Sequence, residues 1–172
     1  MLPGRSASCA PATYAEGVPP PSIPQAELHS RFARASRFAR ARVATLATVG
    51  AEGLPHLVPV VFAMAGGLIY TAVDDKPKST RRLRRLDNIT ATGRVSLLVD
   101  EYAEDWSQLW WIRVDGAARV LDDDAQSRIG IDALVRKYVQ YTASPPGGPV
   151  VAIDPDRWVS WSALDTRSTR AG

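Results

Sequence analysis

A chain of 172 residues has room for one domain with a proper hydrophobic core. Its hydrophobic content of 45%, charged content of 23% and net charge of +3 are ordinary for a globular protein and do not by themselves indicate nucleic-acid binding. The single cysteine, Cys9, excludes an internal disulfide framework, and no apolar run approaches the roughly 18 residues of a membrane span or forms a signal peptide. We therefore expect a cytoplasmic protein with no membrane partner.

The first predicted element is a helix from about residue 24 to residue 40. Residues 1–22 before it are rich in proline, alanine, glycine and serine, which indicates a disordered tail. Ser22 and Gln25 have the spacing of a capping box at the helix start. The helix has an apolar face and a basic face, and the basic face carries Arg31, Arg34, Arg37 and Arg40. This basic face is either simply solvated or adds positive potential near an anionic cofactor tail.

Three strand-like segments come next. Residues 43–49 alternate in a β-type pattern, and Gly50 and Gly53 bracket a turn. Residues 58–62 form the second predicted strand. Gly66-Gly67 is a strong hairpin signal before a third strand over 68–73.

A short loop, DDKPK at 74–78, then leads into a predicted helix over 79–91 that Ser79 or Thr80 can cap. Free amide groups at a helix start favour a phosphate, and the lysines before it add full charges. The arginines of the helix supply further positive charge. The sequence therefore predicts an anion site here, whereas the alternative is a solvated run of charges.

The remaining elements alternate strands with one helix. Residues 94–102 form a nearly continuous apolar strand, which we expect to be buried on both faces. Residues 106–120 follow, with Trp110, Ile112 and Val114 on one face, Trp111, Arg113 and Asp115 on the other, and a bend at Gly116. The aspartates at 122–124 cap a helix over 123–142. Residues 149–153 and 157–163 form the last two strands, and residues 165–172 form a tail.

Taken in order, these motifs resemble the flavin-binding split β-barrel of the pyridoxamine 5'-phosphate oxidase-like superfamily. The resemblance rests on ATLAT at 44–48, GLPH at 53–56, VPV at 58–60, IYT at 69–71 and RVSLLV at 94–99, and it covers about residues 26–163. The DDKPK loop and residues 106–116 resemble the branch of probable coenzyme F420-dependent oxidoreductases. The resemblance implies a mainly β (α+β) fold, a six-stranded antiparallel split barrel (FMN-binding split barrel) with flanking helices over residues 23–164. It also implies a homodimer with the cofactor in a cleft between the two protomers.

The resemblance also implies a phosphate-binding residue near the start of the basic helix. Counting forward from Thr71 places it at Lys78, whereas counting back from Arg94 places it at Arg85. We prefer Lys78 because it lies in the loop before the predicted helix, whereas Arg85 would lie in the middle of that helix. Trp111 and Trp161 each contact the cofactor ring or pack in the dimer interface. Arg113 meets an anionic group or a buried carboxylate. The full predicted cofactor-binding set is Lys76, Lys78, Ser79, Thr80, Arg81, Arg82, Arg85, Val58, Pro59, Val60, Thr71, Trp111, Arg113 and Trp161.

Three function classes follow from this sequence. The first is an F420-dependent oxidoreductase that passes a hydride to a small organic acceptor; no catalytic side chain stands out, so the chemistry would reside in the cofactor. The second is an FMN-dependent oxidase or reductase. The third is a non-catalytic module that binds flavin, haem or nucleic acid. The basic helix is the only support for nucleic acid, and it lacks the interleaved aromatic residues of a stacking surface, so we expect no nucleic-acid partner.

Overall fold

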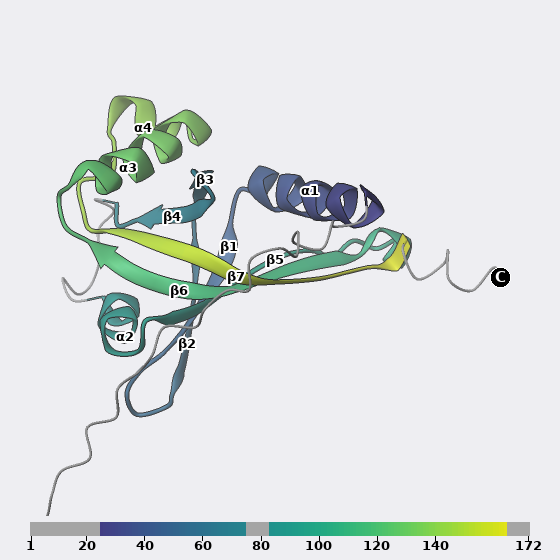
Figure 1. Ribbon diagram of the computed structural model, residues 1–172, viewed down its shortest axis with the longest axis horizontal. Coiled ribbons are helices and arrows are strands. Elements are labelled where there is room, and N and C mark those ends of the chain that lie inside the picture. Colours follow the sequence, from purple (N-terminus) through teal and green to yellow (C-terminus); the bar gives the residue numbers. More distant parts are fainter. Residues whose placement is uncertain (1–24, 75–82, 165–172) are drawn as a thin grey trace, which may run out of the picture.

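The structure of the chain, a computed structural model, describes residues 25–74 and 83–164 (Figure 1). The predicted tails at 1–22 and 165–172 and the capping residue Ser22 lie outside these residues. No helix of the described part is long and apolar enough to cross a membrane. The helices are α1 (Gln25–Arg40), α2 (Arg84–Thr92), α3 (Ala125–Lys137) and α4 (Gln140–Ala143), with a short 3-10 turn at Trp106–Gln108. The strands are β1 (Ala44–Val49), β2 (Pro55–Val60), β3 (Ala63–Ala65), β4 (Leu68–Ala72), β5 (Arg94–Glu101), β6 (Trp110–Leu121) and β7 (Val150–Ser162).

All of these strands join one antiparallel sheet in the order β2-β1-β5-β6-β7-β4-β3. The predicted fold class, an antiparallel split-barrel sheet with flanking helices, is confirmed. The sheet has seven strands, however, where six were expected, because the chain after β2 makes the short strand β3. β3 and β4 form the predicted hairpin, whose turn needs two residues with positive φ: Gly66 has φ 57° and Gly67 has φ 82°. β2 and β3 are the two edges, so hydrogen bonding does not close the sheet.

The two strands predicted at 149–153 and 157–163 are in fact one strand, β7. β7 contains Pro155, which has no amide to donate to a neighbouring strand. The structure accommodates it at a β-bulge, where the register between β6 and β7 shifts at Asp115 and Gly116. A side chain at Gly116 would collide with the backbone of Asp154 and Pro155. The predicted bend at Gly116 is therefore confirmed, and it serves to keep β7 continuous.

Three further predictions need correction. The helix predicted over 123–142 is two helices, because Tyr138 is extended, with φ −120° and ψ 106°, and separates α3 from α4. Its predicted acidic cap is confirmed, since Asp124 Oδ1 accepts a hydrogen bond of 2.8 Å from Ser127 N. The helix predicted over 79–91 begins at Arg84, because Leu83 is extended. The strand predicted as buried on both faces, β5, alternates: Val95, Leu97 and Val99 are buried whereas Ser96, Leu98 and Asp100 are not.

The main core lies on the inner face of the curved sheet. β1, β5, β6 and β7 contribute their alternate residues to it, which is the expected pattern of a strand with one buried face. α1 covers it through Phe38, whose ring lies 4.8 Å from Phe62 and 5.3 Å from Trp158. α2 contributes Ile89, and the buried Asn88 donates a 3.0 Å hydrogen bond to Thr48 Oγ1. Both helices therefore close the inner side of the sheet.

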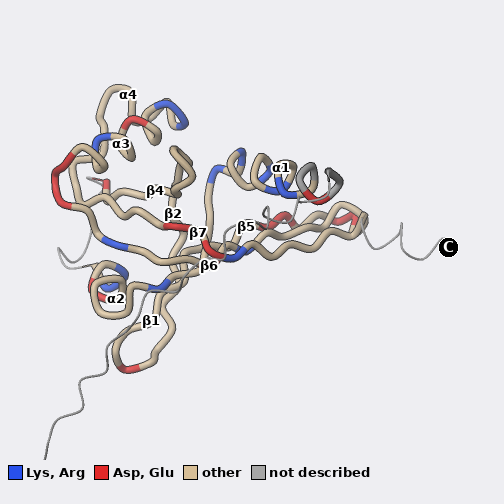
Figure 2. The backbone as a smooth tube through the Cα atoms, in the orientation of Figure 1, with Lys and Arg blue, Asp and Glu red and all other residues tan. Residues whose placement is uncertain are grey.

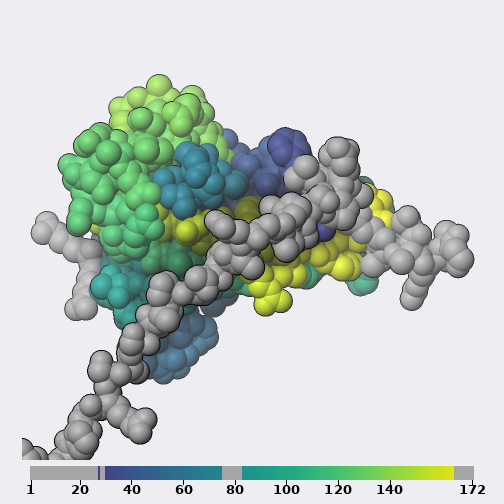
Figure 3. Space-filling view, viewed as in Figure 1, coloured from purple at the N-terminus to yellow at the C-terminus, as the bar shows by residue number. Residues whose placement is uncertain are grey.

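The outer face of the sheet is covered over only part of its width. α3 and α4 pack on β3, β4 and the beginning of β7, and Figure 3 shows them as a continuous green body beside the blue hairpin. The rest of this face, formed by β1, β2, β5, β6 and the second half of β7, is called here the bare sheet face. Its apolar side chains remain accessible: Leu57 is 60% exposed, Leu98 36% and Trp161 38%. The boundary between the covered and the bare parts is where the candidate site lies.

Candidate functional site

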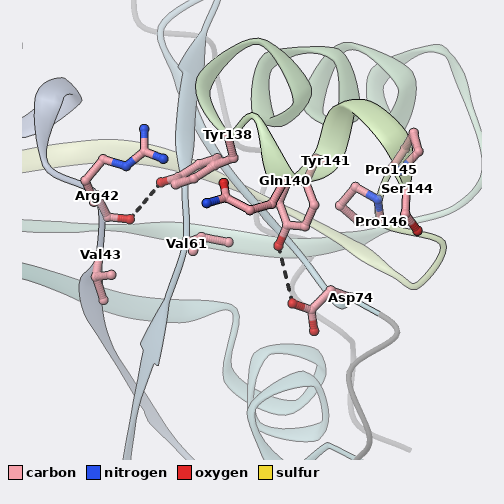
Figure 4. A pocket seen from close by; sticks show the side chains of 10 residues that line it. All are labelled: Arg42, Val43, Val61, Asp74, Tyr138, Gln140, Tyr141, Ser144, Pro145 and Pro146. Carbon is pink, nitrogen blue, oxygen red and sulfur yellow. Dashed lines mark hydrogen bonds between the residues drawn. The ribbon is translucent and has the colours of Figure 1, made fainter.

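A cleft of about 570 Å³ separates the α3–α4 junction from the ends of the neighbouring strands (Figure 4). Segments far apart in the sequence build it: the start of β1, the link from β2 to β3, the residue after β4, and the loop after α4. Its size is within the range of small-molecule sites, and aromatic, proline and valine side chains form most of its wall. The lining residues are Arg42, Val43, Val61, Asp74, Tyr138, Gln140, Tyr141, Ser144, Pro145 and Pro146.

Tyr138 fastens the helical wall of the cleft to the strands. Its buried hydroxyl accepts a 3.0 Å hydrogen bond from Phe62 N and is within donating distance of Phe62 O at 2.8 Å and Arg42 O at 2.9 Å. Burial raises the pKa of this phenol, so it stays protonated and can donate. The extended backbone at Tyr138 brings the ring to this position, which explains why α3 ends there.

Two cations stand beside this tyrosine. Arg42 Nη1 donates a 2.8 Å hydrogen bond to Lys137 O, and its guanidinium carbon lies 4.5 Å from the centre of the Tyr138 ring. Lys137 Nζ is buried 3.8 Å from the centre of the Phe62 ring and has no hydrogen-bond partner among the described groups. Burial, reinforced by the nearby charge of Arg42, lowers the pKa of Lys137 to about 8. Arg42 is therefore the permanent positive charge of the cleft, whereas Lys137 loses its charge at a lower pH than an ordinary lysine.

At the other end of the cleft, one carboxylate interacts with a tyrosine and an arginine. Tyr141 Oη donates a long, 3.4 Å hydrogen bond to Asp74 Oδ2. Burial, together with the charge of Asp74, raises the pKa of Tyr141 to about 12. Burial lowers the pKa of Arg85, and the charge of Asp74 opposes that shift, so Arg85 lies near this end of the cleft. The cleft thus has an apolar middle, with Arg42 at one end and the Asp74 carboxylate, which interacts electrostatically with Arg85, at the other.

The cleft adjoins the bare sheet face. Val43 lines both the cleft and a smaller hollow of about 490 Å³, which also includes Asp100 of β5. Asp100 pairs in register with Trp111, and Trp111 with Trp161, on the bare side of β5, β6 and β7. A molecule in the cleft would therefore lie next to a surface that carries two accessible tryptophans.

The model of the family described as pyridoxamine 5'-phosphate oxidase matches residues 33–162 of this chain. The chain belongs to this family. None of the curated proteins matches the sequence. The superfamily resemblance predicted from the motifs is confirmed, and the F420 branch within it remains a prediction.

Solved structures of this type share the fold at low sequence identity. The conserved hypothetical protein Rv2991 from Mycobacterium tuberculosis superposes with a TM-score of 0.61 at 22% identity, over 85% of this chain and 89% of that one. A FAD-binding protein from Mesorhizobium loti gives 0.59 at 19% identity, over 76% and 90%. The heme storage protein HutZ from Vibrio cholerae gives 0.56 at 15% identity, over 79% and 93%. At these identities the likeness concerns the fold alone.

Most of the anion site predicted for this family member lies outside the described residues, namely Lys76, Lys78, Ser79, Thr80, Arg81 and Arg82. Arg85 is described, and it is half-buried in the first turn of α2. Lys78 was preferred to Arg85 as the phosphate ligand because Arg85 was expected to lie in the middle of the helix. That reason is wrong, since α2 begins at Arg84. A first-turn arginine can meet a phosphate near the free amides of the helix start. Arg85 and Lys78 therefore both remain candidates.

The four predicted contacts from β2 and β4 lie beside the cleft without lining it. Val58 and Val60 pack in the core, Pro59 is exposed on the bare sheet face, and Thr71 is buried in β4. Val61 and Asp74, which follow these strands, line the cleft instead. The contact of Val58, Pro59, Val60 and Thr71 with a cofactor stays a prediction.

Trp111, Arg113 and Trp161 come together on the bare sheet face. Their predicted side of the strand is confirmed, because Trp110, Ile112 and Val114 are buried on the other side. Arg113 Nε lies 3.1 Å from Asp115 Oδ1, which also accepts a 2.7 Å hydrogen bond from Ser96. A carboxylate neighbour for Arg113 was one of the two alternatives. Within one protomer none of the three lines the cleft.

Sequence reasoning missed the residues that build the cleft wall. Tyr138 lay within the helix predicted over 123–142 without a functional role, and Arg42, Lys137 and Tyr141 were not singled out. The only available signal was the close spacing of two tyrosines next to a lysine at 137–141. That spacing also suits an ordinary buried helix face, so the assignment required the tertiary structure.

Proposed function

We propose that this chain is an oxidoreductase that binds coenzyme F420 in the cleft and transfers a hydride between it and a small organic acceptor. The observation that carries the proposal is the cleft itself, with an apolar, tyrosine-walled middle, the positive charge of Arg42 at one end, and Arg85 in electrostatic contact with Asp74 at the other. A ring system with an anionic tail has this same division between an apolar part and a charged part. When bound, the deazaflavin supplies the hydride chemistry, and the protein binds, orients and excludes water.

The residues present fit such a cofactor. Val43, Val61, Tyr138 and Tyr141 would contact the ring, since flat apolar surfaces favour aromatic and branched neighbours. Arg42 and Arg85 would meet anionic groups through charge-assisted hydrogen bonds. The sequence adds Lys76 and Lys78, nine and seven residues before Arg85. This number of cations favours the strongly anionic F420 over FMN.

The same proposal includes a homodimer formed through the bare sheet face. Exposed apolar surface of this kind marks an interaction site in soluble proteins. Trp111 and Trp161 would then lie in the interface next to the cleft, where they can wall a ring bound between the protomers. The cofactor site would be complete only in the dimer.

Two alternatives have their own support. The Mesorhizobium loti protein is described as FAD-binding, as is a protein from Mycobacterium smegmatis, which favours the FMN reading. HutZ is described as a heme storage protein. Haem needs an axial ligand, and the cleft offers only tyrosines for this role. Tyr138 already bonds backbone groups and Tyr141 bonds Asp74, so we place haem third.

The test is to purify the chain from a host that makes F420 and FMN, record its absorption spectrum, and titrate it with each cofactor. We expect colourless protein that binds F420 and oxidises the reduced form when an acceptor is present. Arg85→Gln or Lys78→Ala should weaken F420 binding about tenfold, the loss of one hydrogen bond to a charged group. Arg128→Gln, an exposed arginine on α3, should leave binding unchanged. Tight FMN binding without F420 affinity would establish the alternative, and binding of neither would refute the proposal.

A further inference from the structure

A second hollow, of about 520 Å³, lies between α1 and the ends of β6 and β7. It is called here the α1 groove. Arg34, Arg37 and Arg40 project into it from one face of α1, at spacings of three residues, and Figure 2 shows the basic segments of this helix in blue. Ser160, Trp161 and Ser162 of β7 line the opposite side.

The three arginines of the α1 groove form no ion pair with a described residue. No carboxylate is among the described residues that line the groove, and two carboxylates, Asp100 and Glu101, share the adjoining hollow with Arg37 and Arg40. Arg31, one turn away on the same helix, differs because its guanidinium lies 2.7 Å from Glu27. Three like charges along one helix face repel one another, and this cost falls when an anion binds among them.

The arginines are held by weak contacts that leave their donors available. The guanidinium carbon of Arg37 lies 4.3 Å from the centre of the Trp110 ring, a contact that uses the face of the guanidinium and not its N–H groups. Arg34 Nη1 reaches only the backbone oxygen of Trp158, at 3.5 Å. Arg40 is exposed. The groove therefore combines preoriented cations with the hydroxyls of Ser160 and Ser162.

We propose that the α1 groove is a second binding site, for a phosphate- or carboxylate-bearing group of a small organic ligand. Guanidinium groups bind such oxyanions through paired hydrogen bonds, and serine hydroxyls can complete the shell. Leu164, which also lines the groove, offers an apolar surface to the rest of the molecule. The proposal stands on the groove alone and holds whichever cofactor the cleft takes.

The groove also communicates with the cleft. The smaller hollow of about 490 Å³ shares Arg37 and Arg40 with the α1 groove, and Arg42 and Val43 with the cleft. The anionic group can thus come from either of two sources: a separate ligand, or the tail of the cofactor in the cleft. The chemistry recognised is the same in both cases.

The experiment is calorimetric titration of the full chain with pyrophosphate at fixed ionic strength. We expect wild-type protein and Arg31→Gln to bind alike, and Arg37→Gln/Arg40→Gln to bind at least about fivefold more weakly. Arg40→Gln alone, at an exposed position that cannot disturb folding, should show a smaller loss of the same sign. Equal binding by the double variant and the wild type, or no binding by the wild type at millimolar pyrophosphate, would overturn the proposal.

A second titration distinguishes the two sources. The protein is first saturated with F420 or FMN, whichever binds in the cleft, and is then titrated with pyrophosphate. Unchanged pyrophosphate affinity supports a separate ligand in the α1 groove. If the saturated protein no longer binds pyrophosphate, and Arg37→Gln/Arg40→Gln also binds the cofactor more weakly than wild type, the cofactor tail is the anion in the α1 groove. If the saturated protein no longer binds pyrophosphate but the double variant binds the cofactor as tightly as wild type, pyrophosphate binds in the cleft, and the proposal is overturned.

Discussion

Removal of one hydroxyl, in Tyr138→Phe, tests the connection between α3 and the strands. The ring would keep its packing, including the contact with Arg42, while the hydroxyl contacts of 2.8–3.0 Å to Phe62 and of 2.9 Å to Arg42 O would be lost. Phe62 is fully buried, so its amide would be left without this acceptor in a region that water does not reach. An orphaned buried polar group costs about 1–3 kcal/mol. We therefore expect the free energy of unfolding to fall by about 2 kcal/mol.

Urea unfolding at neutral pH measures this difference, with an unchanged slope expected because the core surface is the same. Tyr141→Phe is the matched control, since its hydroxyl makes only the 3.4 Å bond to Asp74. We expect that control to lose less than about 1 kcal/mol. Equal losses for the two variants would refute the view that Tyr138 is the fastening residue of the cleft.

Three other perturbations follow from the same structure. The pKa of Lys137 in the folded protein is about 8, below its value in the unfolded chain. Between pH 8 and about 10 the unfolded chain therefore binds more protons than the folded protein, and folding becomes more favourable as the pH rises. The urea midpoint of wild type, relative to that of Lys137→Met, should therefore rise with pH through this window. Gly116→Ala should cost about 1–3 kcal/mol in the same assay, because the new methyl group meets the backbone of β7, whereas Ala117→Ser at the next, exposed position should cost little. Leu98→Glu places a charge on the bare sheet face and should convert a dimer to a monomer in sedimentation, while Ile129→Glu, exposed on α3, should not; a dimer unaffected by both would move the interface elsewhere.

The elements that local patterns determine were predictable. α1, the strands with alternating residues, the Gly66-Gly67 turn and the Asp124 cap depend on neighbours within a few positions, and all four appear in the structure. β7 was predicted as two strands, and its continuity depends on a bulge at Pro155 that Gly116 of another strand makes possible. The split between α3 and α4 has the same kind of origin, since a bond to the backbone of Phe62 fixes the position of Tyr138.

The cleft could not be read from the sequence for a related reason. Its lining residues come from positions 42–43, 61, 74 and 138–146, which only the strand order brings together. The motif-based prediction concentrated on residues 74–85 and on the tryptophans, where charge and ring chemistry are visible in the chain. Arg85 shows the limit of that reasoning, because a shift of a few residues in the helix start changes its role from helix interior to first turn.

The position of β7 has a consequence for how the protein is made. β7 pairs with β6 along one edge and with β4 along the other, and it follows both of them in the sequence. Until it has left the ribosome, β1, β2, β5 and β6 on one side and the β3–β4 hairpin on the other have no shared strand, and both keep an open hydrogen-bonding edge. Such pairing across more than 75 residues slows folding and prolongs the exposure of those edges. During synthesis this chain therefore depends on a late step, the insertion of a single strand between two partly formed halves.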